Sequence, residues 1–339
     1  MRIAYNTRIT VSSVTRSTAP LPKRLVPEFA SIKLTERCQM KCKVCDYWKS
    51  DPPDAIEIDK AIEMVHELHK NGVRLLYYTG GEPLLRQDFF DVLRATSHLD
   101  FRRVALQTNG LLLKRYSAEI NASQITNVCV SLDGTHEAND ELRGARNAYA
   151  AIVSYLPLIM KPVSVCCTFT SVFAECCDGL IDLCRKNGYK LIINLPTNTL
   201  YHCNSDEVTK EIKDLWPDSN QIEATIDKLR RSRIMSGPLL GCVRRYMLDR
   251  RLPYKNCILG FHAINIDSQG NIRTGCYVFQ PVGNILKSSL SEIVASPAYR
   301  KSVDKMFVMD CPHCGSGYEK NFLYQNPQFL FSKWIHMPG

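Results

Sequence analysis

The sequence predicts an α/β fold in which a partial (β/α)6 TIM-like barrel is followed by a small C-terminal domain. Three observations support this prediction. Short apolar or β-branched segments alternate with helix-like segments from residue 30 to about 200, polar motifs follow several of the apolar segments, and a hairpin signal lies among spaced cysteines after residue 256. Strands that alternate with helices form a parallel sheet, and such a barrel carries its functional groups at the C-terminal ends of its strands.

The barrel is expected to contain six strands and the five helices between them. The strands are predicted at residues 30–34, 73–78, 103–107, 127–132, 163–170 and 190–195. The helices are predicted at residues 59–70, 88–97, 114–121, 145–159 and 174–186. Gly72 follows the first of these helices, in a position where helices commonly end.

Composition and turn signals divide the rest of the chain. Residues 1–29 are expected to be an N-terminal extension that covers the barrel at 30–205, although the first 27 residues, with five basic residues and no acid, also fit an organellar transit segment. Residues 206–256 are expected to form a basic helical linker. Residues 257–339 then form the C-terminal domain and tail, with a hairpin turn at 267–271 and a helix at 291–306.

Length and cysteine content narrow the class of protein. A chain of 339 residues can hold one large and one small domain, and no apolar run approaches the roughly 18 residues that a membrane-spanning helix needs. The 15 cysteines are an odd number, and too few for a disulfide scaffold of this length. Because thiols stay reduced in the cytosol, we expect a cytoplasmic protein without a membrane partner.

The formal net charge of +9 is not spread evenly along the chain, since a second basic segment follows the barrel. Between residues 228 and 255 there are nine basic residues and one acid. Such a segment can attract a phosphorylated or nucleotide-linked substrate or an acidic electron donor, and it can equally be a solvated helix face. A nucleic acid is not expected as a partner, because no nucleic-acid binding motif accompanies the segment.

Three cysteines directly after the first strand constrain the chemistry most tightly. Cys38, Cys42 and Cys45 are spaced x3 and x2. A four-iron four-sulfur cluster normally takes four ligands, so three thiolates would leave one iron open for a substrate or cofactor. A zinc loop is the alternative, although zinc sites usually supply four ligands in paired knuckles.

This loop resembles the signature of the radical S-adenosylmethionine (radical SAM) superfamily, in which SAM chelates the open iron. Val44 departs from the family pattern, since the position before the last cysteine is usually aromatic. The resemblance continues in four residues after the second strand, which match the family motif that contacts the amino group of SAM. These are Gly80, Gly81, Glu82 and Pro83.

Weaker matches to SAM-contacting positions follow the third and fourth strands. They are Thr108, Asn109, Ser131 and Asp133. Arg143 resembles an arginine that pairs with the SAM carboxylate in a related subgroup, and a bidentate geometry would suit that pairing. For each of these polar residues, turn or helix-cap chemistry is the alternative.

The resemblance implies an activity and a set of partners. A 4Fe-4S cluster at Cys38, Cys42 and Cys45 would cleave SAM reductively to methionine and a 5'-deoxyadenosyl radical, which would abstract a hydrogen atom from a substrate carbon. A flavodoxin or ferredoxin type electron donor would supply the electron.

Four later cysteines could close a second cluster completely. Cys257, Cys276, Cys311 and Cys314 are spaced x18, x34 and x2. This pattern resembles the Twitch domain, a shortened relative of the SPASM domain, and implies an auxiliary 4Fe-4S cluster that passes electrons. A structural zinc and a disulfide are the alternatives.

Cys242 lies inside the basic segment and is a candidate catalytic residue. We consider it as a hydrogen-atom donor that quenches a substrate radical, as in the radical SAM epimerases. A buried core cysteine is the alternative.

The basic segment favours a small anionic, sugar or nucleoside substrate in specialised, antibiotic-type biosynthesis, with oxidation, epimerisation or C–C bond formation as the outcome. A SPASM or Twitch peptide maturase, acting on a ribosomal peptide or a sulfatase, is the alternative. Molybdenum-cofactor cyclases differ, because they use three cysteines at the second cluster and end in Gly-Gly, whereas this chain ends in Pro338-Gly339. An iron-sulfur electron carrier is a further alternative, but it would have no use for an open iron.

Overall fold

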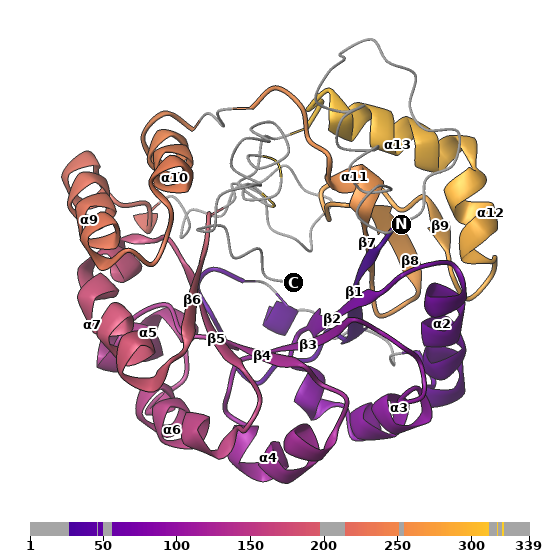
Figure 1. Cartoon of the computed structure of the whole chain (residues 1–339), viewed down its shortest axis with the longest axis horizontal. Coiled ribbons are helices and arrows are strands. Elements are labelled where there is room, and N and C mark those ends of the chain that lie inside the picture. Colours follow the sequence, from indigo (N-terminus) through magenta and orange to yellow (C-terminus); the bar gives the residue numbers. More distant parts are fainter. Residues whose placement is uncertain are drawn as a thin grey trace.

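A computed structural model describes residues 27–45, 47–49, 56–196, 214–250, 254–311, 317 and 321. Its centre is a curved sheet in which six strands run parallel in sequence order (Figure 1). The strands are β1 (Phe29–Thr35), β2 (Leu75–Gly80), β3 (Arg103–Thr108), β4 (Asn127–Ser131), β5 (Val163–Thr168) and β6 (Lys190–Asn194). All six agree with the predicted strands to within two residues at each end, which confirms the α/β barrel.

Helices cover the convex side of this sheet (Figure 1). They are α2 (Ile58–Lys70), α3 (Phe89–Ala95), α4 (Leu113–Ala122), α5 (His136–Arg143), α6 (Ala148–Tyr155) and α7 (Ser171–Asn187). The sequence did not predict α5, because it contains a single large apolar residue, Leu142, and therefore lacks a helical apolar stripe. The helix predicted at 145–159 is shorter than expected and ends in a 3-10 turn, η3 (Leu156–Leu158), that includes Pro157.

The two faces of the barrel strands differ in polarity. In β1, Ala30, Ile32 and Leu34 are fully buried and belong to the main apolar core, which they share with the surrounding helices. The opposite, concave face is mostly polar along the sheet. By strand register it carries Ser31, Lys33, Tyr77, Gln107, Asn127, Ser131, Ser164 and Thr168. The described α-helices lie outside the barrel (Figure 1), so these side chains line its inside, where the short 3-10 helix η1 (Tyr47–Lys49) contacts Lys33.

The C-terminal region continues the same sheet. Strand β7 (Ala263–Ile266) pairs parallel with β1, and β8 (Asn271–Thr274) and β9 (Gly283–Asn284) follow antiparallel, so that the sheet has nine strands. The predicted hairpin is thus confirmed, but it extends the barrel sheet directly. Three helices pack beside it: α11 (Leu259–His262), α12 (Leu290–Ala295) and α13 (Pro297–Phe307).

The predicted helix at 291–306 is divided in two. Ser296 ends α12 and caps α13 by accepting a hydrogen bond from the backbone N–H of Tyr299, and Pro297 occupies the first position of α13. Proline is favoured there because its missing N–H is not needed in the first helical turn.

Two further helices stand outside the barrel. Helix α9 (Ser219–Ser232) packs on α7, and α10 (Gly237–Asp249) packs on α9. The predicted linker at 206–256 thus contains two helices among its described residues. None of the described helices is both long and apolar enough to cross a membrane.

Candidate functional site

The three-cysteine loop follows β1 at the C-terminal end of the strand. Cys42 is buried, Cys38 and Cys45 are half-buried, and the backbone N–H of Cys45 donates to the carbonyl of Cys42 at 3.3 Å. Burial raises the pKa values of the Cys38 and Cys42 thiols. No disulfide joins any of the described cysteines, and no three His, Cys, Asp or Glu side chains in the described ranges converge as ligands of a single ion. Cluster ligands need not converge in this way, because each binds its own iron.

Glycines allow this loop to pack against its neighbours. A Cβ atom on Gly81 would lie 2.1 Å from the carbonyl oxygen of Arg37, and one on Gly144 would lie 2.4 Å from that of Lys41. Gly80 has a φ of +131°, and a Cβ there would lie 2.2 Å from the oxygen of Thr35. These glycines therefore let backbone approach backbone closely, which holds the cysteine loop in place.

Glu82 lies directly behind the loop and is fully buried. Its Oε1 accepts hydrogen bonds from the N–H of Leu84 at 3.1 Å and from the Thr108 hydroxyl at 2.9 Å. Its Oε2 accepts one from the N–H of Asn109 at 2.7 Å. Burial raises the pKa of Glu82 to about 7, against the opposing effect of these hydrogen bonds. Since a carboxylate has about four acceptor positions, one position remains for a further donor.

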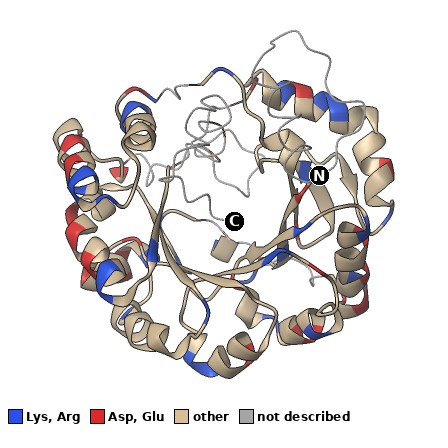
Figure 2. Cartoon of the chain, in the orientation of Figure 1, with Lys and Arg blue, Asp and Glu red and all other residues tan. Residues whose placement is uncertain are grey.

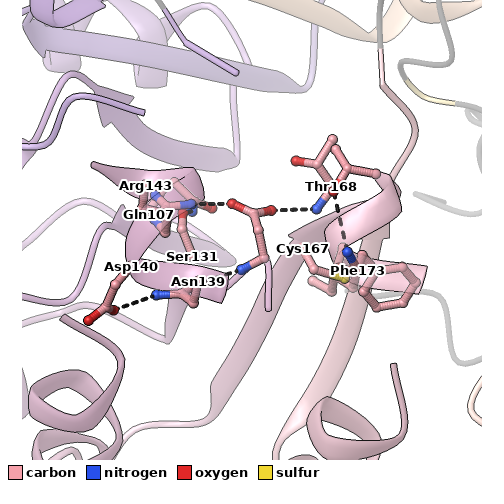
Figure 3. A network of polar contacts seen from close by, with 11 residues as sticks. Gln107, Ser131, Asn139, Asp140, Arg143, Cys167, Thr168 and Phe173 are labelled. Carbon is pink, nitrogen blue, oxygen red and sulfur yellow. Dashed lines mark hydrogen bonds and ion pairs between the residues drawn. The ribbon is translucent and has the colours of Figure 1, made fainter. Parts of the chain in front are cut away.

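A second buried carboxylate holds Arg143 (Figure 3). Arg143 at the end of α5 forms an ion pair with Asp133, which follows β4, and the other oxygen of Asp133 accepts from the N–H of Thr168 at 2.6 Å. The backbone N–H of Asp133 donates to Asn139 at 3.1 Å. The structure therefore gives Arg143 a partner within the chain, while its buried Nε has no hydrogen-bond partner among the described residues.

Ser131 belongs to a polar chain across three strands. Its hydroxyl accepts from the amide of Gln107 at 2.7 Å, and the amide oxygen of Gln107 accepts from the Tyr77 hydroxyl. Sequence reasoning singled out Ser131 and missed its two partners. These two partners could have been found from the sequence, because polar residues occupy alternate positions of otherwise apolar strands and therefore share one face of the sheet.

Lys33, on the concave face of β1, was also missed. Its ammonium lies 3.6 Å from the ring centroid of Tyr277 and 4.5 Å from that of Tyr47. Burial lowers the pKa of Lys33 to about 7. Tyr277 follows Cys276, and Tyr47 lies two positions after Cys45, so this lysine contacts both cysteine-containing regions.

The donor set fits an iron-sulfur cluster with SAM beside it. Cys38, Cys42 and Cys45 would hold the cluster. Glu82, with one acceptor position left, suits an amino group, and the unpartnered Nε of Arg143 suits a ligand oxygen. Thr108 and Asn109 face Glu82, and Pro83 begins a 3-10 turn that Glu82 caps. The SAM contacts of all these residues stay predictions.

The second cysteine group is partly described. Cys257 and Cys276 pack in one small apolar cluster with Leu259 and Met306. Cys311 follows α13, and the last residue of that helix, Phe307, accepts a hydrogen bond from the N–H of Cys257 at 3.2 Å. Cys314 lies outside the described residues. Asn321 was not predicted, and its amide nitrogen lies 3.4 Å from the Cys257 sulfur.

Cys242 lies on α10 and belongs to the main apolar core. Burial raises the pKa of its thiol to about 12. The structure thus places it on an outer helix and on none of the barrel strands, and its role as a hydrogen-atom donor stays a prediction.

Four of the nine basic residues of the segment have partners on or beside the outer helices, which carry both basic and acidic residues (Figure 2). Lys228 contacts Asp178 at 2.9 Å, Arg230 pairs with Asp227, and Arg244 pairs with Glu223. The Arg250 guanidinium stacks on Trp216, 2.8 Å from the ring centroid. These four charges are therefore satisfied by α7, α9 and the segment before α9, away from the cysteine loop, and they no longer favour an anionic substrate.

Two family models match the sequence. One describes the radical SAM superfamily and matches residues 32–173. The other, SPASM, describes an iron-sulfur cluster-binding domain and matches residues 257–315. These ranges include both cysteine groups.

The chain is similar to two kinds of curated protein. It is 35% identical over 103 residues to a probable GTP 3',8-cyclase of Archaeoglobus fulgidus, a match that covers 30% of this chain and 34% of that protein. It is 26% identical over 280 residues to the sporulation killing factor maturation protein SkfB of Bacillus subtilis, which covers 80% of this chain and 66% of that protein. The chain thus spans about a third of the length of the first relative.

The fold is similar to that of Streptococcus suis SuiB bound to its precursor peptide SuiA. The TM-score is 0.66 at 19% sequence identity, and the match covers 89% of this chain and 71% of SuiB. At this identity the comparison shows a shared fold.

Proposed function

We propose that this chain, which is a member of the radical SAM superfamily with a SPASM-type iron-sulfur region, modifies a peptide. The observation that carries the proposal is the similarity to the maturation protein SkfB, which extends over 80% of the chain. The shared fold with SuiB, whose structure holds a precursor peptide, agrees with it. The ion pairs of Lys228, Arg230 and Arg244 on α9 and α10 weaken the argument that the basic segment binds a small anionic substrate.

In this proposal the cysteine loop binds a cluster, and the residues behind the loop bind SAM. Cys38, Cys42 and Cys45 bind the SAM-associated cluster, Glu82 accepts a hydrogen bond from the amino group of SAM, and Arg143 faces its carboxylate. When bound, the reduced cluster supplies the electron for the cleavage of SAM, which leads to abstraction of a hydrogen atom from the substrate. Cys257, Cys276, Cys311 and Cys314 bind an auxiliary cluster.

The polar concave face of the barrel would hold the peptide. Its side chains, among them Ser131, Gln107 and Thr168, carry hydroxyl and amide groups that can donate to or accept from a peptide backbone. An extended peptide has backbone N–H and C=O groups along its whole length. A site that binds it therefore needs many hydrogen-bonding side chains and few charged ones.

A flavodoxin or ferredoxin type protein is the proposed electron donor, and a reducing compartment such as the cytoplasm is the proposed location. The exposed lysines of the cysteine loop support a partner of acidic character. Lys41 and Lys49 both lie near the Trp48 ring, at 5.9 and 5.5 Å, and Trp48 donates to the carbonyl of Cys42 at 3.2 Å.

A nucleotide-derived substrate is the second candidate. The 35% identity to the GTP 3',8-cyclase over 103 residues favours it. That match covers 30% of this chain. The match to the radical SAM family, over residues 32–173, is long enough to explain this similarity without a shared substrate.

Anaerobic reconstitution with iron and sulfide tests the shared chemistry first. With dithionite and SAM, the protein should release 5'-deoxyadenosine, and the Cys42→Ala variant should release none. Cys184→Ala, which changes a buried cysteine of α7, should behave like the wild type. Absence of 5'-deoxyadenosine from the reconstituted wild type would refute the proposed activity.

The substrate class needs a separate measurement. The reconstituted enzyme is incubated with a peptide fraction from cells, and in parallel with GTP, and both are followed by mass spectrometry. The expected result is a SAM-dependent loss of two hydrogen atoms from a peptide, one taken by the 5'-deoxyadenosyl radical and the other leaving as a proton to solvent and an electron to the proposed auxiliary cluster. Consumption of GTP without any change in the peptide fraction would favour the second candidate.

A further inference from the structure

We propose that two asparagine side chains, Asn109 and Asn321, donate hydrogen bonds to the cluster thiolates of Cys38 and Cys257 and thereby raise the reduction potentials of the two clusters. The inference rests on the proposed function only in its assignment of these cysteines as ligands. Neither asparagine belongs to a cysteine motif, and each comes to its cysteine from a distant part of the chain.

Asn109 follows β3 and is almost fully buried. Its Nδ2 lies 3.7 Å from the Cys38 sulfur, within the range of an N–H···S hydrogen bond. Its Oδ1 accepts from the backbone N–H of Leu111 at 3.1 Å. Because a backbone N–H can only donate, the amide oxygen must face Leu111, and this directs the NH2 group toward Cys38.

The remaining groups of Asn109 are also fixed. Its Nδ2 donates to the Gln39 amide oxygen at 3.1 Å, and its backbone N–H donates to Glu82 at 2.7 Å. The two hydrogens of the amide are thus divided between Gln39 and the Cys38 sulfur. Asn109 therefore connects the cysteine loop with the carboxylate that lies behind it.

Asn321 repeats this arrangement at the second cysteine group. Its side chain is fully buried, and its Nδ2 lies 3.4 Å from the Cys257 sulfur. Its Oδ1 accepts from the backbone N–H of Ile258 at 2.8 Å. As with Leu111 at Asn109, a backbone N–H, here that of the residue after Cys257, fixes which end of the amide faces the sulfur.

The effect on the clusters follows from charge. Reduction adds an electron to a cluster, and the sulfur ligands carry part of the added negative charge. A donor aimed at a ligand sulfur stabilises the reduced form more than the oxidised form, and hydrogen bonds to the sulfurs are a main determinant of iron-sulfur potentials. Loss of either donor should make the corresponding cluster harder to reduce.

The experiment measures the midpoint potential of each cluster separately by EPR. For the first cluster, Asn109→Ala and Asn109→Asp are compared in a background that lacks Cys257 and Cys276. For the second cluster, Asn321→Ala is measured in a background that lacks Cys38, Cys42 and Cys45. Asn187→Ala, on the exposed end of α7, is the matched control and should leave both potentials unchanged.

We expect a more negative potential for each alanine variant, and a larger shift for Asn109→Asp because it places a carboxylate beside the thiolate. A tenfold change in the ratio of reduced to oxidised cluster corresponds to about 59 mV for one electron. Full iron content with an unchanged potential in Asn109→Ala and Asn321→Ala overturns the inference. Failure of the wild type to take up iron would instead refute the proposed function.

A measurement on the unmodified protein decides the case if a variant does not take up iron. The protein is labelled with 15N-asparagine, and its reduced clusters are examined by pulsed EPR. A weak coupling to nitrogen, assigned by comparison with unlabelled protein, supports the inference. Its absence from both clusters overturns it.

Discussion

Glu82 is a buried carboxyl group that forms no ion pair with any residue in the described ranges, and its protonation should contribute to the pH dependence of the stability of the iron-free protein. Burial raises its pKa from the ordinary 4.5 to about 7. A raised folded-state pKa contributes stability that is fully present below the unfolded pKa and is lost as the pH rises through the folded pKa. The full pKa shift corresponds to roughly 3 kcal/mol of unfolding free energy. Most of this stability is lost as the pH rises from about 5 to 7.

The Glu82→Gln variant should abolish this part of the pH dependence. Thermal unfolding of the iron-free protein is measured from about pH 5 to 8. The wild type should lose roughly 3 kcal/mol more unfolding free energy across this range than the variant does. Glu119→Gln, on the exposed side of α4, should follow the wild type. Parallel pH profiles for wild type and Glu82→Gln would show that the carboxyl has an ordinary pKa.

At the scale of elements, the cysteine loop depends on how closely β2 can approach it. The backbone N–H groups of Gly81 and Glu82 donate to the carbonyls of Thr35 and Arg37, at 3.0 and 2.8 Å. The loop is therefore held to the turn after β2 by hydrogen bonds that only a glycine at position 81 permits, since any Cβ there would overlap the loop backbone.

Gly81→Ala should therefore displace the loop. We expect a loss of about 1–3 kcal/mol in unfolding free energy, as for other overpacked sites, together with reduced iron uptake. Thermal unfolding and iron content after reconstitution check both effects. Gly241→Ala in α10, where a Cβ meets open space, should instead be neutral or stabilising by about 0.5–1 kcal/mol and should take up iron normally. Normal iron uptake by Gly81→Ala would contradict this account of the loop.

Elements with a strong periodic signal were predictable from the sequence, and contacts between elements were not. The barrel strands are apolar on the helix side and end in recognisable motifs, so their positions and the cysteine triad could be predicted. Helix α5 could not be predicted, because it lies beside the site and its sequence is therefore mostly polar, without an apolar stripe. Asn321 could not either, since nothing local marks a residue 64 positions from its cysteine partner. Lys228 of α9 suggested an anion site for the same reason, because its acidic partner, Asp178, is distant in sequence.

At the scale of the whole molecule, the two cysteine-containing regions share one sheet. Ile32 of β1 is the register partner of Ile266 of β7, and both are fully buried. Further hydrogen bonds join the regions, from Leu290 of α12 to Glu67 of α2 at 2.9 Å, and from the N–H of Ile56 to Ser268 at 3.2 Å. A change in the C-terminal region should therefore reach the barrel through β1, the strand that precedes Cys38.

Ile266→Ala tests this continuity. The substitution should cost about 2–5 kcal/mol, as expected for a buried isoleucine, and should increase hydrogen exchange in β1 and β2 as well as in β7 and β8. Ile181→Ala, in α7 at the opposite edge of the sheet, should increase exchange near α7 and β6 and leave β7 unchanged. The measurement is hydrogen exchange followed by mass spectrometry. If exchange rises in Ile266→Ala only between residues 257 and 311, the C-terminal region folds as an independent unit, and β7 does not couple the two cysteine groups.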